Sequence, residues 1–287
     1  MFNIVSGYFY FKQVHPTAVF SKQMNPAFLY DLNSYFCSME EIAYMPKIPK
    51  FEDMILFENQ DIIAINKPAF VSSLNDRGGA SRHILKMAKA YYSEAQLCHR
   101  LDKETSGVLL IAKNPETYRL ASIEFEKRRV NKVYHAIIEG VHKMDALKVD
   151  LPILNMGNKH VSIDKARGKK AETWFESLEY FQHYTLIACR PVSGRMHQIR
   201  IHLASQRATI AGDDMYGGKP VFLSKFKRGF TLAKHEEERP IMQRFALHAY
   251  TMGIRLGKED YNFQAPYPKD FATLLKQLRK YDGNKYA

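Results

Sequence analysis

From residue 51 onward, short apolar runs alternate with polar, turn-prone stretches, and this pattern predicts strands more often than helices. Two apolar runs, Ile55–Phe57 and Ile62–Ile65, flank the turn-prone stretch 58–61, which predicts a β-hairpin. Pro68 is expected to end the second strand, because proline cannot donate a backbone hydrogen bond. Further strands are predicted at residues 108–112, 133–139, 173–178, 184–189 and 248–256.

Two other segments have the periodicity of an amphipathic helix. Asn114 is typical of a helix cap, and Pro115 is typical of the first helical position. One face of that helix is predicted to carry Tyr118, Ala121, Ser122 and Phe125. A second helix is predicted near the end of the sequence, because four apolar residues there have the spacing i, i+3, i+4, i+7: Phe271, Leu274, Leu275 and Leu278.

Strands outnumber helices and do not alternate with them along the chain. This order favours an α+β domain with a mixed, largely antiparallel central sheet, flanked by helices and loops. Residues 1–50 differ, because they contain 11 aromatic residues but no clear helical or strand period. We therefore expect an aromatic-rich extension over residues 1–50, which packs through its aromatic side chains on one main domain over residues 51–287.

The distribution of charge indicates what kind of partner the protein binds. Residues 1–50 hold four Lys or Arg and three Asp or Glu, so +11 of the formal charge of +12 lies in residues 51–287. Such an excess indicates an anionic partner, and nucleic acid is the usual one, because phosphates attract lysine and arginine. Single basic runs, at 127–129, 167–170 and 225–228, are more often solvated surface.

The cysteines and the lengths of the apolar runs indicate where in the cell the protein is expected to act. The three cysteines are odd in number and lack CxxC spacing, which predicts neither a disulfide framework nor a zinc site. Residues 1–20 lack the basic start and cleavage site of a signal peptide, and no run reaches about 18 apolar residues. We therefore expect a cytoplasmic protein without a membrane span, and a monomer without a protein partner.

The stretch His99–Gly107 contains the strongest candidate for chemistry. Asp102 lies in it between Arg100 and a Thr-Ser-Gly turn, directly before the apolar run at 108–112. A carboxylate at such a loop-to-strand junction is held by rigid backbone yet open to a cleft, which suits a catalytic group. The alternative is a structural ion pair between Asp102 and Arg100 that caps a turn.

Further blocks share an order and spacing with this stretch. They are Asn66-Lys67-Pro68, residues 132–136, residues 194–203, and residues 212–217 followed by 247–249. Together they resemble the RluA-type family of RNA pseudouridine synthases, over about residues 51–287. His99 before Arg-Leu-Asp is typical of the RluA branch, and residues 1–50 do not resemble the basic S4 RNA-binding domain of many relatives.

The resemblance implies isomerisation of uridine to pseudouridine in ribosomal or transfer RNA, without a metal or an organic cofactor. Asp102 would be the catalytic carboxylate, which either attacks C1′ of the ribose or removes the 2′ proton. Arg200 would be the guanidinium that keeps this carboxylate charged, with Arg195 as the competing candidate. Tyr134 would stack on the turned uracil and relay the C5 proton.

The target nucleotide must leave its stack before C1′ can be reached, and by resemblance Arg100 would fill the gap. The residues predicted to contact RNA are His99, Arg100, Lys132, Arg195, His197 and His202. For the last two, the alternative is that they are core histidines with satisfied ring nitrogens. Cys98 is expected to be a buried apolar position and not a thiol nucleophile.

A second function is compatible with the same fold. A structured-RNA-binding protein that has lost catalysis would retain basic surfaces without an intact trio of acid, arginine and aromatic ring. Asp102, Arg200 and Tyr134 are all present, which favours the enzyme. A different nucleoside-processing enzyme would be expected to carry metal-ligand or phosphate-loop motifs, and Gly78-Gly79 is too short for such a loop.

Overall fold

The computed structural model describes residues 48–75, 82–157, 160–233 and 236–283, and strands dominate this part of the chain. The strands are β1 Ile55–Glu58, β2 Ile62–Lys67, β3 Gln96–Leu97, β4 Ser106–Ala112, β5 Asn131–Glu139, β6 Leu147–Asp150, β7 Ile153–Gly157, β8 His160–Ile163, β9 Glu172–Tyr180, β10 Tyr184–Pro191, β11 Leu247–Leu256 and β12 Glu259–Gln264. The helices are α2 Ile84–Tyr91, α3 Pro115–Glu126, α4 Gln198–Ser205 and α5 Lys269–Gln277, with 3-10 turns at Glu52–Met54, Asp214–Tyr216 and Leu223–Lys225 and a π-helical turn at Leu278–Asp282.

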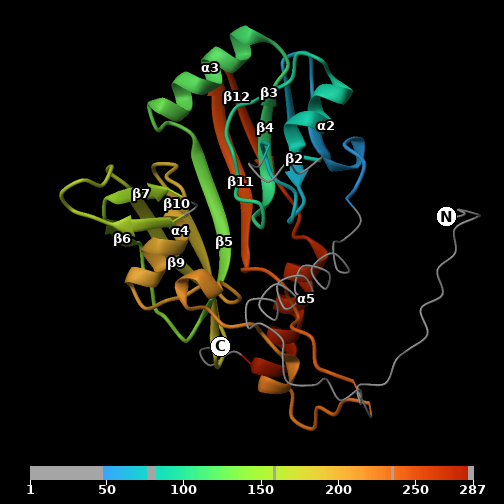
Figure 1. Cartoon of the computed structure of the whole chain (residues 1–287), viewed down its shortest axis with the longest axis vertical. Coiled ribbons are helices and arrows are strands. Elements are labelled where there is room, and N and C mark those ends of the chain that lie inside the picture. Colours follow the sequence, from blue (N-terminus) through green and yellow to red (C-terminus); the bar gives the residue numbers. More distant parts are fainter. Residues whose placement is uncertain (1–47, 76–81, 158–159, 234–235, 284–287) are drawn as a thin grey trace, which may run out of the picture. The chain divides into compact units, whose positions relative to one another are not determined.

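Ten of the described strands form one sheet, in the order β1-β2-β4-β11-β5-β10-β9-β6, with β12 paired to β11 and β3 to β4. Strands β7 and β8 form a separate two-stranded sheet. Within the described ranges the strand pairs are antiparallel, except β4 with β11. Figure 1 shows β2, β4, β11 and β5 side by side, with α3 near one end of these strands and α5 toward the other. The predicted α+β class with a largely antiparallel sheet is confirmed, as is the predicted hairpin of β1 and β2.

The parallel pair joins the two halves of the sheet. Ser106 and Gly107 of β4 pair with His248 and Ala249 of β11, and Ala249 in turn pairs with Tyr134 of β5. Gly107 has φ +115°, and a Cβ there would lie 2.1 Å from the carbonyl oxygen of Ala249, so only glycine permits this approach. The loop that precedes β4 is thereby brought next to the middle of β5.

Strands β2 and β4 are buried on both faces, which explains why they read as continuous apolar runs. On one face, Ile63 and Leu109 belong to a core cluster that includes Ala88 of α2. On the other face, Ile62 and Leu110 belong to a cluster that α3 covers. The loop that precedes β4 is therefore attached to a strand pair that is packed on both faces.

The predicted cap of α3 is confirmed, and the four residues predicted to share one face of this helix differ in burial. The Asn114 side chain accepts a hydrogen bond from Thr117 N at 2.8 Å and donates one to Asp61 at 2.9 Å. This tie to the β1–β2 turn directs Thr117 toward the sheet together with Ala121, and both are buried. Of the residues predicted to share a face with Ala121, Tyr118 is 37% exposed.

The C-terminal helix is confirmed with its predicted apolar face. Its four predicted residues, Phe271, Leu274, Leu275 and Leu278, are all buried in the core cluster of β5, β9 and β10. No helix in the described ranges is long and apolar enough to span a bilayer. The expected extension falls on residues that are mostly outside the described ones, which begin at residue 48, and its packing stays a prediction.

Candidate active site

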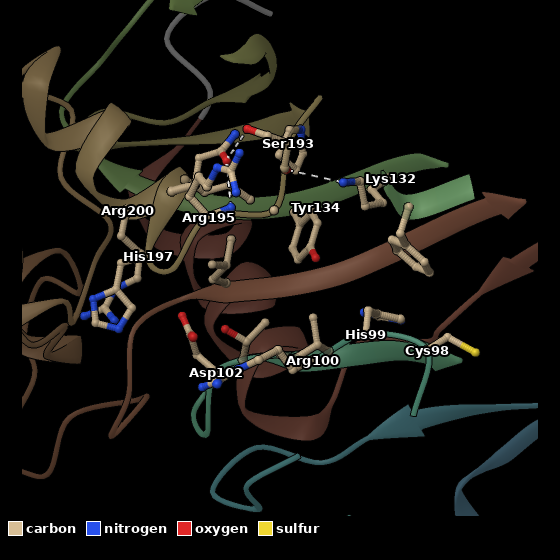
Figure 2. A pocket seen from close by; sticks show the side chains of 18 of the residues that line it. Cys98, His99, Arg100, Asp102, Lys132, Tyr134, Ser193, Arg195, His197 and Arg200 are labelled. Atoms are coloured by element: carbon tan, nitrogen blue, oxygen red, sulfur yellow. Dashed lines mark hydrogen bonds between the residues drawn. The ribbon is translucent and has the colours of Figure 1, made fainter. Parts of the chain in front are cut away.

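A cavity of about 420 Å³ opens where the loop before β4, strand β5 and the segment leading into α4 meet (Figure 2). Its lining residues are Cys98, His99, Arg100, Leu101, Asp102, Thr105, Phe125, Glu126, Lys132, Tyr134, Pro191, Ser193, Gly194, Arg195, His197, Gln198, Ile199, Arg200 and Leu247. The structure therefore gathers all the site residues predicted from sequence, except His202, around one cavity. These predicted residues are spread over about a hundred positions of the sequence, from His99 to Arg200.

Asp102 lies on a turn whose backbone is held on both sides. The carbonyl of Asp102 accepts a hydrogen bond from Thr105 N at 3.1 Å. The hydroxyl of Ser73 donates to Leu101 O at 2.8 Å and accepts from Leu101 N at 3.0 Å. The ammonium of Lys67 donates to Lys103 O at 3.2 Å. The turn thus presents the Asp102 side chain on a fixed backbone.

The carboxylate of Asp102 points into the cavity, toward the space between Tyr134 and the His197–Arg200 side (Figure 2). It takes part in none of the side-chain hydrogen bonds or ion pairs found among the described residues, so the alternative of a structural Asp102–Arg100 pair is not found there. Arg100 is exposed at the mouth of the same cavity. A carboxylate with no protein partner, open to a cavity, is available for a substrate.

Tyr134 forms the wall opposite Asp102. It lies in the sheet register between Cys189 of β10 and Ala249 of β11, which fixes the direction of its ring. Burial raises the pKa of Tyr134, and the negative charge of Asp102 raises it further. The phenol is therefore neutral at physiological pH, and its ring offers a flat apolar surface to the cavity.

Arg200 does not form the expected ion pair with Asp102. Its Nε and Nη2 donate to the two carboxylate oxygens of Asp213, each at 2.6 Å, and this pair is buried. The guanidinium carbon lies 4.9 Å from the centre of the Tyr216 ring and 4.2 Å from that of Phe245. A planar cation held by a bidentate carboxylate and two aromatic faces has little freedom to turn.

The physical reason is the burial of Asp213. Its side chain is 0% exposed, and a buried carboxylate needs a charged partner at hydrogen-bond distance. Burial lowers the pKa of Arg200, but the Asp213 carboxylate more than offsets this and raises it overall, and Asp102 contributes to the increase. Arg200 therefore acts on Asp102 through space, from a position that Asp213 fixes.

Arg195, the competing candidate, is also engaged elsewhere. Its Nε donates to Lys170 O at 3.4 Å, and its backbone N–H donates to the side-chain oxygen of Gln198 at 3.0 Å. The same Gln198 oxygen accepts from Ser193 Oγ at 2.6 Å, while the amide nitrogen donates to Glu172 O at 2.8 Å. Gln198 thus fixes the loop that carries Arg195 into the cavity wall.

The three histidines of the prediction have three different environments. His99 Nε2 accepts from Leu110 N at 3.1 Å, and burial lowers its pKa to about 3, so it is a neutral structural acceptor at the edge of the cavity. His202 is buried outside the cavity, with Nδ1 bonded to the Thr173 hydroxyl and Nε2 to Leu151 O, each at 2.9 Å. The prediction that His202 contacts RNA is therefore replaced by its alternative, a satisfied core histidine.

His197 is the histidine that faces the site. It adopts a left-handed backbone conformation (φ 54°) directly before α4, which is uncommon for a residue with a side chain. Its Nδ1 lies 3.0 Å from the Tyr216 hydroxyl. Burial lowers the pKa of His197, and the charge of Asp102 opposes this shift. A strained backbone that directs a polar ring into a cavity is a common property of functional sites.

Two further cavity residues differ in charge. Burial raises the pKa of the Cys98 thiol to about 12, so the thiol stays protonated and is a poor nucleophile. Burial, with a contribution from Arg128, lowers the pKa of Lys132 to about 8. Its Nζ donates to Ser193 O at 3.3 Å, as the dashed line in Figure 2 marks. Lys132 is therefore a cation that titrates near neutral pH.

Sequence reasoning missed the residues that hold the site without facing substrate. Asp213 and Tyr216 were recognised only as part of a block, and Gln198 only as part of another, with no role for any of them. Their roles depend on which buried groups they meet, and the block itself was the only signal. No group of three His, Cys, Asp or Glu suited to a metal ion occurs in the part of the chain that the structure describes.

Comparison with known proteins gives one consistent result. The model of the RNA pseudouridylate synthase family matches residues 61–205. An uncharacterized RNA pseudouridine synthase of Zymomonas mobilis is 33% identical, over 79% of this chain and 99% of that protein. Ribosomal large subunit pseudouridine synthase D of Borreliella burgdorferi is 31% identical, over 79% of this chain and 69% of that protein. Ribosomal large subunit pseudouridine synthase C of Escherichia coli is 32% identical, over 84% and 75%.

Solved structures agree at the level of the fold. Human RNA pseudouridylate synthase domain containing 4 has a TM-score of 0.60 at 24% identity, over 80% of this chain and 94% of that chain. Human RNA pseudouridylate synthase domain containing 1 has a TM-score of 0.58 at 22% identity, over 80% and 96%. With the family match and relatives above 30% identity over most of their length, the chain belongs to the RNA pseudouridylate synthase family.

Proposed function

We propose that this RNA pseudouridine synthase acts on uridine in ribosomal RNA, with Asp102 as the catalytic carboxylate. Ribosomal RNA is preferred to transfer RNA because relatives such as those of Borreliella burgdorferi and Escherichia coli are named as ribosomal large subunit enzymes. The observation that carries the assignment of Asp102 is its open position. Its carboxylate faces the 420 Å³ cavity, opposite Tyr134, without a hydrogen bond or ion pair to any described side chain.

Two chemical routes fit this position. In the first, a carboxylate oxygen attacks C1′ and uracil leaves through N1; after the base turns, C5 attacks C1′ and expels the carboxylate. In the second, the carboxylate removes the 2′ proton and the C1′–N1 bond breaks to give a glycal; after the base turns, C5 bonds to C1′ and the protonated carboxyl group returns the proton to C2′. Both routes end with loss of the C5 proton and gain of a proton at N1. Both routes also require an ionised Asp102.

Tyr134 would act mainly as a stacking surface. Its raised pKa keeps the hydroxyl protonated, so it cannot take up the C5 proton as a phenolate. A relay is still chemically consistent, provided that the phenol passes its own proton on as it receives the one from C5. The ring would also hold the uracil in place while it turns about the broken bond.

Arg100 would assist the extrusion of the uridine. It is exposed at the cavity mouth, two residues before Asp102. Unstacking a nucleotide costs a few kcal/mol, and a planar guanidinium in the vacated position offsets part of that cost. The proposal is that Arg100 and Asp102 enter the RNA together, one into the stack and the other toward the extruded ribose.

The experiment that tests the proposed function measures the release of tritium from uridine C5 in RNA. Ribosomal and transfer RNA are transcribed with tritium at uridine C5, and the purified protein is added to each. Release of tritium from ribosomal RNA, and not from transfer RNA, is expected. Release from transfer RNA alone would refute the substrate. RNA binding without release from either RNA would favour the alternative, a non-catalytic RNA-binding protein on the same fold.

Lys132 predicts a pH dependence of RNA binding. With a pKa of about 8, its amine is charged below that pH and neutral above it, so its contact with a phosphate is lost as pH rises from about 7 to about 9. A charge-assisted contact is worth about 1.5–3 kcal/mol, so RNA affinity is expected to fall about tenfold or more. The dissociation constant, measured across this range by filter binding, checks the prediction.

The control for this prediction is Lys132→Arg, which stays charged throughout the range. Lys67, whose pKa burial lowers to about 7, also titrates there, so the wild type alone does not isolate Lys132. The prediction is therefore the difference between the two proteins. If the wild type and Lys132→Arg lose affinity in parallel, Lys132 is not the group responsible.

Three further expectations belong to the same proposal. We expect the protein to act as a monomer, in the cytoplasm, with residues 51–287 as the catalytic domain and residues 1–50 as an extension that packs on it. The charge distribution supports this division, because residues 1–50 hold only four of the 42 Lys and Arg. RNA is the partner that the family implies.

A further inference from the structure

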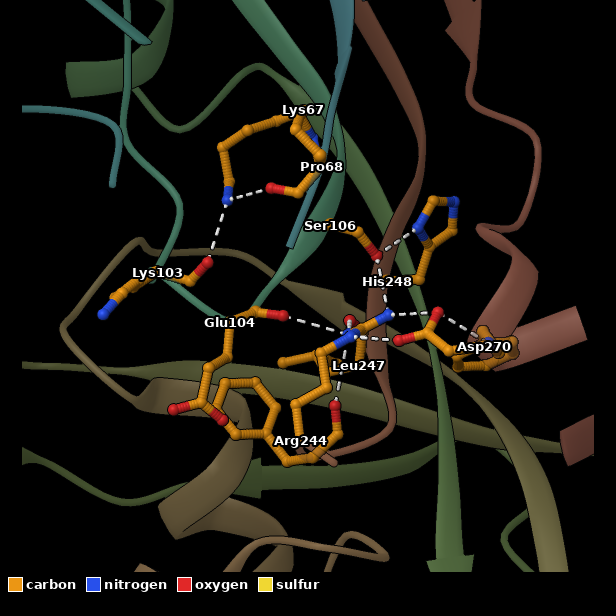
Figure 3. Close-up of polar contacts among 11 residues, drawn as sticks. Lys67, Pro68, Lys103, Glu104, Ser106, Arg244, Leu247, His248 and Asp270 are labelled. Atoms are coloured by element: carbon orange, nitrogen blue, oxygen red, sulfur yellow. Dashed lines mark hydrogen bonds and ion pairs between the residues drawn. The ribbon is translucent and has the colours of Figure 1, made fainter. Parts of the chain in front are cut away.

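Arg244 is among the largest fully buried side chains of the described residues, and it does not line the cavity. Its Nη1 donates to Glu104 O at 2.9 Å, and its Nη2 donates to Ser106 Oγ at 3.3 Å (Figure 3). Glu104 belongs to the turn that begins at Asp102, and Ser106 is the first residue of β4. One buried guanidinium therefore binds the two positions at which this turn enters β4.

The hydrogen bonds of His248 determine which hydrogen bond the Ser106 hydroxyl donates and which it accepts. Burial lowers the pKa of His248 to about 4, so the imidazole is neutral. Its Nε2 faces Ala265 O at 3.1 Å, which can only accept, so Nε2 carries the proton and Nδ1 is the acceptor. The Ser106 hydroxyl must then donate to Nδ1, at 2.9 Å, and its oxygen is left to accept from Arg244.

The other edge of the guanidinium binds the C-terminal helix. Arg244 Nε and Nη2 donate to the carboxylate of Asp270 at 2.7 and 3.1 Å, and Asp270 lies in the first turn of α5. Nη1 also donates to the carbonyls of Phe245 and Leu247 at 3.3 and 3.2 Å, which places the guanidinium against the start of β11. Arg244 thus joins α5 and β11 to the Asp102 turn, which lies more than a hundred residues earlier in the sequence.

We propose that Arg244, oriented by Asp270, is a positioning residue for Asp102. The proposal rests on the proposed function of Asp102 as the catalytic carboxylate. Arg244 holds the carbonyl of Glu104 and the hydroxyl of Ser106, and these two points set where the backbone of the turn lies. Displacement of a reacting group by about 1 Å can cost on the order of 100-fold in rate, so a tether of the backbone controls the reaction without touching RNA.

The hydrogen bonds of Arg244 point in fixed directions, so a lysine cannot replace arginine at this position. Arg244 uses all three of its nitrogens, on two edges of one plane, to reach Asp270 and the turn together. A lysine ammonium is a single point and cannot span both sets of acceptors. Lys67 holds the neighbouring carbonyl of Lys103 from the other side, so loss of Arg244 loosens the turn at its β4 end and leaves the Lys103 contact in place.

The experiment compares Arg244→Lys and Asp270→Asn with a matched variant, Arg279→Lys. Arg279 also joins the C-terminal end of the chain to the sheet, through Glu179 at 2.8 Å, and has no contact with residues 102–106 among the interactions of the described chain. Tritium release is measured as kcat and KM on RNA of fixed sequence. For both Arg244→Lys and Asp270→Asn we expect kcat to fall about 10- to 100-fold with KM within about twofold of wild type. Arg279→Lys should retain the wild-type kcat.

Amide hydrogen exchange of the free proteins is the second readout, and it does not depend on catalysis. Exchange at residues 102–106 should be faster in Arg244→Lys than in Arg279→Lys, while the central strand β5 exchanges alike in both. If Arg244→Lys does not fold, Ser106→Ala, which removes only the hydroxyl, replaces it in both measurements. A wild-type protein that never releases tritium refutes the proposed function, whatever the exchange shows.

Two results would overturn the positioning role itself. The first is a wild-type kcat in Arg244→Lys when the wild type is active. The second is a loss of activity in Arg244→Lys that comes with an equal loss in Arg279→Lys, or with faster exchange throughout the domain. Either result would make Arg244 a general contributor to stability, with no particular connection to Asp102.

Discussion

Substitution of Asp102 by Asn is expected to lower tritium release by about 10⁴-fold or more, because enzymes that lose a nucleophile or its base lose rate on that scale. The amide has the shape of the carboxylate, but it is a poor nucleophile at C1′ and cannot remove the 2′ proton. Both proposed routes therefore stop at the first step. The measurement is single-turnover release from C5-tritiated ribosomal RNA with enzyme in excess, which separates chemistry from binding and product release.

The stability of Asp102→Asn should match that of the wild type. The Asp102 side chain has no hydrogen bond or ion pair with the described residues, and its backbone contact to Thr105 survives the change. A matched control is Asp214→Asn, which alters an exposed carboxylate whose oxygen accepts a hydrogen bond from Met215 N at 2.8 Å and from no other described residue. Asp214→Asn should release tritium at the wild-type rate. Release by Asp102→Asn within about tenfold of the control would remove Asp102 from the catalytic role.

Much of the fold followed from local pattern. Apolar runs predicted β2, β4 and β10, because strands buried on both faces consist of apolar residues throughout. The cap at Asn114 followed from its side chain and the proline after it. The face of α3 did not, because its direction depends on the hydrogen bond between Asn114 and Asp61, two residues that lie far apart in sequence.

The candidate site followed from separated blocks of sequence, and the structure brings them around one cavity. What the blocks could not supply was the identity of partners. Arg200 was expected beside Asp102, yet it binds Asp213, which lies thirteen residues later in the sequence. The Asp213 carboxylate is fully buried, and a buried charge without a charged partner is strongly destabilising. Arg244 was not recognised at all. Three of its acceptors are backbone carbonyls, which leave no pattern in a sequence, and its side-chain acceptors Ser106 and Asp270 lie 138 and 26 residues away.

The pair of Arg200 and Asp213 gives the second large prediction. Substitution of either residue alone leaves the other as a buried charge without its partner, which costs about 3–5 kcal/mol of stability. Asp213→Leu and Arg200→Met should therefore each lower the free energy of unfolding by about that amount. Denaturation in urea, monitored by circular dichroism, measures the loss. Exposed pairs such as Arg190–Glu176 serve as the control, because single substitutions there are expected to cost no more than about 1 kcal/mol.

The double variant Arg200→Met, Asp213→Leu separates stability from catalysis. Replacing a buried ion pair by apolar residues of similar size is often neutral, so the double variant should recover most of the stability that each single variant loses. Its tritium release should nevertheless stay far below that of the wild type, because the guanidinium that Asp213 holds near Asp102 is then missing. Recovery of activity together with stability would mean that the pair only supports the fold. Activity lost while stability returns would place Arg200 in the reaction, acting on Asp102 from the position that Asp213 holds.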